Sequence, residues 1–200
     1  KQVLIINNED DFAATQGLFA RKMSAKTNIK DTFRITKEDL DQADIVILGP
    51  GPGDINDNEN PRMQRLGEIT KYCFEKEIPK LGICLGHQAL CKYLGAEIIP
   101  EDKPIQGTPV TRPCFGAKEV VAGYNSFSGL PFNTPAGTKT ELDENGRIAT
   151  IQGRHYTGMQ FHPESIMTPN GYEIFKKAIL LLTLREKPQG KFVRITCKSQ

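Results

Sequence analysis

A cysteine lies between two glycines in the segment Gly82-Ile83-Cys84-Leu85-Gly86. This spacing is that of a nucleophile elbow, a sharp turn from a strand into a helix, with cysteine in place of serine. The two glycines remove Cβ atoms that would clash in the turn, and the helix N-terminus favours a thiolate on Cys84. The backbone N–H of Leu85 can point at a developing oxyanion. The segment therefore predicts a nucleophilic thiol; the alternative is a buried structural cysteine.

A histidine that could act as the base lies in Phe161-His162-Pro163-Glu164-Ser165, directly after a predicted strand. In an open α/β sheet, functional side chains gather at the carboxyl ends of the strands. His162 could accept the thiol proton, and Glu164 could hold the other ring nitrogen and fix its tautomer. A lone histidine is more often structural, but the neighbouring acid and the elbow favour a functional His162. His87 and His155 lack these surroundings and are predicted to be structural.

A glycine-rich loop, Gly49-Pro50-Gly51-Pro52-Gly53-Asp54, also follows a predicted strand. Its backbone N–H groups, left open by glycine, could line an oxyanion hole or an anion site. The loop lacks the Lys-Ser/Thr pair of a P-loop, so nucleotide binding is not expected. The alternative interpretation is a rigid turn.

The elements that must position these residues alternate along the chain. Short apolar runs predict strands at 3–7, 29–35, 43–49, 79–84 and 156–161, and helical spacing predicts helices at 11–22, 61–76, 86–94 and 171–185. This alternation predicts an α/β fold with an open, mostly parallel central sheet and helices on both faces. The stretch 97–160 changes to short pieces that predict a smaller antiparallel sheet, with a hairpin turn at Asp143-Glu144-Asn145-Gly146.

Composition sets further limits. The chain has 200 residues, which predicts one domain at 1–185 followed by a basic tail, edge strand or docking segment at 186–200. The 26 basic side chains nearly balance the 24 acidic ones, so a general nucleic-acid binder is not expected. No apolar run is long enough for a membrane helix. The 5 cysteines show no regular spacing, which argues against disulfides and structural zinc and predicts a cytoplasmic protein.

Taken together, the cysteine elbow, the His-Pro-Glu segment and the glycine-rich loop resemble the class I, triad-type glutamine amidotransferases. The resemblance covers residues 1–185 in order and spacing, and it is nearest to the small subunits of anthranilate synthase and aminodeoxychorismate synthase. It implies that Cys84 attacks the side-chain amide of L-glutamine, that His162 is the general base and acid, and that Glu164 completes the triad.

The resemblance also implies how substrate is held. The backbone N–H groups of Gly53 and Leu85 would form the oxyanion hole. The residues implied in glutamine binding are Gly51, Pro52, Gly53, Gln88, Ser126 and Phe127. The last two lie in Tyr124-Asn125-Ser126-Phe127, where the common family pattern reads His-Ser-Leu.

Ammonia released by this chemistry must reach a second active site, and no segment of the chain resembles such a site. A chorismate-binding synthase, as a separate subunit or a fused domain, is therefore the implied partner, with no cofactor or metal in this chain and Mg²⁺ in the synthase. The stretch Ile105-Gln106-Gly107-Thr108-Pro109-Val110 departs from the His-Gly-Lys pattern of anthranilate and aminobenzoate subunits. Together with 123–127 it is more similar to the amidotransferase portion of phenazine-type aminodeoxyisochorismate synthases.

Two other functions use the same fold. One is a peptidase or other hydrolase with an elbow cysteine. Gln88 and the Ser126 segment argue against this function. The other is a non-catalytic, amidotransferase-like regulatory protein. This function is not favoured, because the chain keeps all three triad positions, Cys84, His162 and Glu164.

Overall fold

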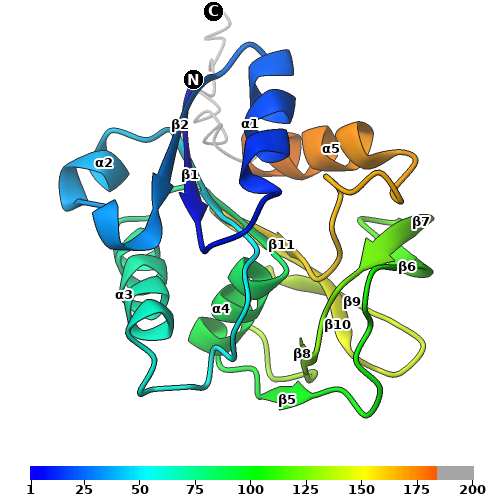
Figure 1. Ribbon diagram of the computed structural model, residues 1–200. Coiled ribbons are helices and arrows are strands. Elements are labelled where there is room, and N and C mark those ends of the chain that lie inside the picture. Colours follow the sequence, from blue (N-terminus) through cyan, green and yellow to red (C-terminus); the bar gives the residue numbers. More distant parts are fainter. Residues whose placement is uncertain (184–200) are drawn as a thin grey trace, which may run out of the picture.

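The computed structural model describes residues 1–183, in which a seven-stranded sheet has the order β2-β1-β3-β4-β11-β10-β9 (Figure 1). Its strands are β1 (Gln2–Asn7), β2 (Lys26–Asp31), β3 (Ile45–Leu48), β4 (Lys80–Ile83), β9 (Lys139–Leu142), β10 (Ile148–Gly153) and β11 (Tyr156–Met159). The first five strands in the spatial order run parallel to one another. Strand β10 runs antiparallel to β11, and β9 runs antiparallel to β10. The predicted mostly parallel sheet is confirmed. The predicted tail at 186–200 lies outside the described residues.

The middle of the chain adds two small antiparallel pairs. One joins β5 (Ile98–Pro100) to β8 (Phe127–Gly129), and the other is the hairpin of β6 (Thr108–Cys114) and β7 (Ala117–Gly123). The predicted smaller antiparallel sheet is therefore two separate pairs. The predicted turn at 143–146 joins β9 to β10. The Asp143 carboxylate accepts hydrogen bonds from the N–H groups of Asn145 and Arg147, and Gly146 has φ +72°.

Helices cover both faces of the sheet, as predicted. They are α1 (Ala13–Lys22), α2 (Lys37–Asp41), α3 (Pro61–Glu75), α4 (Leu85–Leu94) and α5 (Gly171–Thr183), with a 3₁₀ turn at Thr32–Arg34. Helices α3 and α4 pack on one face, and α1 and α5 pack on the other (Figure 1). Strands buried on both faces have continuous apolar runs, which is why the sequence predicts β1 and β3.

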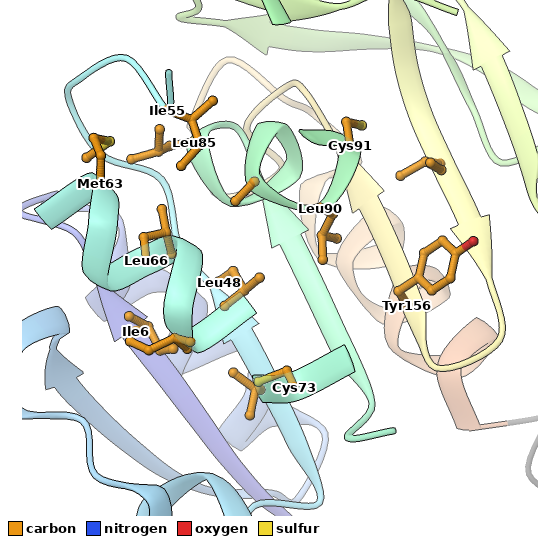
Figure 2. Close-up of a cluster of buried hydrophobic side chains, with 14 of the residues drawn as sticks. Ile6, Leu48, Ile55, Met63, Leu66, Cys73, Leu85, Leu90, Cys91 and Tyr156 are labelled. Carbon is orange, nitrogen blue, oxygen red and sulfur yellow. The ribbon is translucent and has the colours of Figure 1, made fainter. Parts of the chain in front are cut away.

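Two hydrophobic clusters hold these layers together. Alternate residues of β1 point to opposite faces, so Leu4 and Ile6 join the α3/α4 cluster while Val3 and Ile5 join the α1/α5 cluster. Figure 2 shows Ile6 and Leu48 of the sheet against the α3 side chains of the first cluster. Because both clusters are buried, the sheet is fixed from both sides, and with it the edge where its parallel strands end.

The strand predicted at 29–35 is wrong in its bounds. Strand β2 runs from Lys26 to Asp31, and the chain then turns because the Asp31 carboxylate accepts the Phe33 N–H at 2.9 Å. Lys26, Thr27 and Asn28 are polar because β2 is the edge strand, and this polarity hid its start. Helix α2 was not predicted; a capping box between Thr36 and Asp39 begins it.

One lysine is buried in the sheet. Lys80, at the start of β4, is 1% exposed, and its Nζ lies 4.0 Å from the centroid of the Phe74 ring. Burial is the main cause that lowers the pKa of Lys80 to about 8. A charged Lys80 therefore costs folding free energy at neutral pH.

We expect Lys80→Met to raise the free energy of unfolding at pH 7 by about 1–3 kcal/mol. The unfolded chain binds more protons than the folded chain between pH 8 and 10.5, so the wild type gains stability as the pH rises through this window and the advantage of the variant shrinks. Urea denaturation at pH 7 and pH 9.5 measures both effects. Lys71→Met, an exposed position in α3, is the control and should change stability by less than about 0.5 kcal/mol at either pH.

Candidate active site

The backbone turns sharply at Cys84, between the end of β4 and the start of α4. Cys84 has φ +51° and ψ −106°, a strained conformation for a residue with a side chain. Its N–H donates to the Met159 carbonyl of β11 at 3.0 Å, and its carbonyl accepts the Gln88 N–H at 3.0 Å. The chain thus has the elbow expected from its sequence, and the thiol lies at the N-terminus of α4 where negative charge is favoured.

The flanking glycines are required by close backbone contacts. A Cβ at Gly82 would lie 2.6 Å from the Gly86 carbonyl oxygen, and a Cβ at Gly86 would lie 2.0 Å from the Leu48 carbonyl oxygen. Both distances are far below a normal van der Waals contact. Glycine at both positions therefore lets the first turn of α4 pack directly on the ends of β3 and β4.

His162 is placed by a different part of the chain. Its N–H donates to the Ala122 carbonyl of β7 at 2.9 Å, and its own carbonyl accepts the Thr168 hydroxyl at 2.6 Å. The ring is almost completely buried between Phe12 and Tyr124, with ring centroids 5.0 and 4.9 Å away. Both main-chain groups and both neighbouring rings thus restrict the position of the imidazole.

Electrostatics at this histidine favour its charged form. Burial is the largest single influence and lowers the pKa of His162, but Cys84 and Glu164 together outweigh it and raise the pKa well above its usual value. The His162 Nδ1 atom lies 3.4 Å from the Glu164 Oε1 atom. The structure therefore brings His162 together with Cys84 and Glu164, and these two neighbours favour an imidazolium.

A glutamine that sequence reasoning missed also contacts the thiol. The Gln160 Nε2 atom lies 3.6 Å from the Cys84 sulfur, and the Gln160 Oε1 atom accepts from the Gln88 side chain at 3.2 Å. The Gln88 amide also donates to the Phe127 carbonyl at 2.8 Å. Gln88 and Phe127 are thus joined next to Cys84. The signal for Gln160 was its position two residues before His162, at the end of the strand that pairs with β4.

The glycine-rich loop follows β3, the parallel neighbour of β4, and so begins at the same sheet edge as the elbow. Gly53 has φ +121°, and a Cβ at Gly51 would lie 2.3 Å from the Asn8 carbonyl oxygen. The fully buried Asn8, which was not predicted, donates from its side chain to the Gly49 carbonyl at 2.8 Å. Pro52 lies inside this loop.

Ser126 lies before β8, and its carbonyl accepts the Glu101 N–H at 2.9 Å.

The other histidines lie in structural positions. His87 is completely buried, its Nε2 atom is 3.1 Å from the Ile148 carbonyl oxygen, and burial lowers its pKa to about 4. His155 lies in the turn between β10 and β11, where its carbonyl accepts the Lys80 N–H at 2.9 Å. Cys91 is buried in α4 against His87, and burial raises the pKa of its thiol. Cys84 is thus set apart from Cys91 by its backbone and its partners.

Metal-binding clusters and membrane-spanning helices are both absent from the described part of the chain. Within residues 1–183, no group of three or more His, Cys, Asp or Glu side chains is arranged to hold a metal ion. In the same range, no helix is both long and apolar enough to cross a membrane.

A protein-family model described as "Glutamine amidotransferase class-I" matches residues 4–182. The chain belongs to this family. It is 31% identical over 182 residues to a phenazine-specific anthranilate synthase of Pseudomonas fluorescens, covering 87% of this chain but only 28% of that protein. It is 29% identical over 191 residues to anthranilate synthase component 2 of Cyanophora paradoxa, covering 88% of this chain and 97% of the relative.

The fold agrees with solved structures. A protein from Thermoplasma acidophilum described as a putative GMP synthase subunit has a TM-score of 0.77 and 21% identity, with coverage of 92% of this chain and 94% of that chain. The α/β fold expected from the resemblance is thus confirmed. The chain spans about 28% of the length of the phenazine-specific relative, so that protein has a large additional part.

We expect Gly86→Ala to lower the free energy of unfolding by about 2–4 kcal/mol, because its Cβ would overlap the Leu48 carbonyl oxygen. Gly67→Ala, in the middle of α3, is the matched control. Its Cβ would meet nothing within 4 Å, so the better helix propensity of alanine should raise stability by about 0.5–1 kcal/mol. Thermal and urea denaturation of both variants measure the difference. A Gly86→Ala protein as stable as the wild type would contradict the close approach of α4 to β3.

The pKa values of the two buried histidines should be shifted in opposite directions from the usual histidine value. In ¹⁵N-labelled protein, we expect His87 to remain neutral down to about pH 4 and His162 to remain protonated well above pH 6.5. Cys84→Ala should lower the pKa of His162, because it removes the neighbouring negative charge, and leave that of His87 unchanged. With only three histidines in the sequence, His162→Ala assigns the resonance. A His162 titration that is insensitive to Cys84→Ala would contradict the pairing.

Proposed function

We propose that this chain is a glutaminase that hydrolyses the side-chain amide of L-glutamine through Cys84. The observation that carries the proposal is that the strained elbow cysteine, Cys84, and Glu164 both act on the buried His162 ring, whose Nδ1 atom faces Glu164. A carboxamide is a poor electrophile, so its hydrolysis needs a strong nucleophile and donors for the oxyanion. The family to which the chain belongs is consistent with this chemistry.

The proposed reaction has two stages. The Cys84 thiolate attacks the amide carbon, and the backbone N–H groups of Gly53 and Leu85 stabilise the oxyanion. Protonated His162 gives its proton to the leaving nitrogen, the C–N bond breaks, and ammonia departs from a thioester on Cys84. Neutral His162 then takes a proton from water, the hydroxyl attacks the thioester, and glutamate leaves with the thiolate restored beside an imidazolium.

Substrate positioning in this proposal falls to two groups of residues. Gly51, Pro52 and Gly53 lie in the loop after β3. Gln88 would hold the substrate glutamine, and Ser126 and Phe127 would contact its α-amino and carboxylate groups. The bond from Gln88 to the Phe127 carbonyl supports this assignment, because it fixes that segment next to Gln160 and the thiol.

We further propose that the ammonia is passed to a chorismate-utilising synthase of the anthranilate type, as a partner subunit or as a fused domain. Support comes from the two anthranilate synthase relatives, one of which is matched over nearly its full length. In this proposal the chain itself needs no cofactor, any Mg²⁺ belongs to the synthase, and neither nucleic acid nor membrane is a partner. Free thiols at Cys73, Cys84, Cys91 and Cys114 support a reducing compartment, the cytoplasm.

An aminodeoxychorismate or aminodeoxyisochorismate synthase is the alternative partner. The stretch 105–110, which departs from the anthranilate pattern, and the likeness to a phenazine-specific relative favour it. Both partners use the same glutaminase, so the distinction lies in the product of the synthase.

We expect Cys84→Ala, assayed with the co-purified synthase, Mg²⁺ and chorismate, to abolish product formation from glutamine and to keep product formation from ammonium. Cys73→Ala, a buried cysteine of α3, should keep both activities. Fluorescence of anthranilate would identify the anthranilate branch, whereas consumption of chorismate without fluorescence would indicate an aminodeoxy product. If Cys84→Ala changes neither activity, the chain is a non-catalytic regulatory protein and the glutaminase proposal is wrong.

A further inference from the structure

A buried glutamine on α1 contacts the carboxylate of Glu164. The Gln16 side chain is completely buried, and its Nε2 atom donates to the Glu164 Oε1 atom at 2.8 Å, across 148 residues of sequence. The Glu164 side chain is also inaccessible to solvent. Burying a carboxyl group is costly unless hydrogen-bond donors surround it, so the Gln16 donor offsets part of the cost of burying Glu164.

The same carboxylate oxygen faces both Gln16 and His162. The Glu164 Oε1 atom is 2.8 Å from Gln16 Nε2 and 3.4 Å from His162 Nδ1, and within residues 1–183 the Oε2 atom has no hydrogen-bond partner. The bond to Gln16 is therefore the shorter of the two side-chain contacts that orient the carboxylate. Without it, the carboxylate could rotate about its side-chain torsions and move away from the imidazole.

The start of α1 holds both members of the His162–Glu164 pair. Phe12 and Gln16 are four residues apart, the Gln16 N–H donates to the Phe12 carbonyl at 3.0 Å, and such residues share one face of a helix. The Phe12 ring lies against the His162 ring, and the Gln16 amide lies against the Glu164 carboxylate. One helical turn thus contacts the base and its orienting acid together.

We propose that Gln16 is a positioning residue that holds the Glu164 carboxylate in line with His162 during the proposed glutamine hydrolysis. The inference rests on the proposed function for its catalytic consequence. Its structural part, the alignment of the His162–Glu164 pair, can be tested without substrate.

The charged groups around His162 set the direction of the effect. Cys84 and Glu164 favour its protonated form, and Asp10, in the segment before α1, also interacts electrostatically with the ring. Burial raises the pKa of Asp10, whereas the shift of His162 itself is caused by Cys84 and Glu164. If Glu164 loses its alignment, the carboxylate moves away from His162 Nδ1, and the pKa of His162 should fall towards the ordinary value.

The test compares Gln16→Met with Ala20→Gly. Methionine keeps the length and unbranched shape of glutamine but has no N–H donor. Ala20→Gly weakens the same helix at a buried position one turn further from Glu164. For Gln16→Met we expect kcat for ammonia release from glutamine to fall at least about tenfold with KM within about twofold, as for loss of an orienting partner. The His162 titration should move to lower pH by at least about half a unit.

Gln16→Glu supplies a second, pH-dependent readout. Its added carboxyl group can donate to Glu164 only when protonated, so activity relative to the wild type should recover as the pH is lowered. Ala20→Gly should lower the thermal midpoint while leaving the His162 titration and kcat near wild-type values.

Each outcome decides a separate point. A wild type that releases no ammonia, with or without synthase, defeats the proposed function, but the His162 titration of Gln16→Met still decides the inference. Unchanged kcat together with an unchanged titration in Gln16→Met would overturn the role of Gln16. A fall in kcat that Ala20→Gly reproduces, with no shift of His162 in either variant, would assign Gln16 to helix stability alone and also overturn the proposal.

Discussion

The contact between the first turn of α4 and the ends of β3 and β4 is the constraint on which the site depends. It leaves no space for a Cβ at Gly82 or Gly86, and it forces Cys84 into a positive φ. Such a conformation persists only when its surroundings over-determine it. Here the surroundings are the two buried clusters on either face of the sheet, which fix where β3 and β4 end. The hydrophobic core therefore stabilises the strained elbow and, through it, the direction of the thiol.

The remaining parts of the site approach this fixed point from separate segments. His162 is tied to β7 through its backbone, and Gln160 joins the thiol to Gln88 and the 127 region. Glu164 is reached from α1, near the start of the chain. Because most of these groups are buried, their charges interact in a medium of low effective dielectric, where alignment matters more than in water. The pKa of His162 reflects this balance, since burial opposes its charge and the combined effect of Cys84 and Glu164 outweighs burial.

Local patterns were enough to predict the central sheet, the covering helices, the elbow and the 143–146 turn. Each of these depends on glycine spacing, turn residues or apolar runs within a few positions. Strand β2 was misplaced and α2 missed because an edge strand is polar and a five-residue helix has too few turns for a periodic pattern. Gln16 and Asn8 could not be predicted, because a polar residue acquires such a role only from the tertiary contact it makes. The roles assigned to Cys84, His162, Glu164, the oxyanion-hole residues and the glutamine-binding residues stay predictions.

The hydrogen bond between His162 and Ala122 makes the register of the β6–β7 hairpin part of the geometry of the site. Neighbouring residues on a strand direct their carbonyls to opposite sides. A slip of β7 by one residue would thus turn the acceptor away from the His162 N–H and release the segment that carries both the imidazole and Glu164. The tip of the hairpin is held as well, since the Glu141 carboxylate accepts the N–H groups of Phe115 and Gly116 at 2.5 and 2.6 Å. Strand β7 sets the distance between these two anchors, so an insertion or deletion within it would shift one anchor relative to the other even though much of the strand is exposed to solvent.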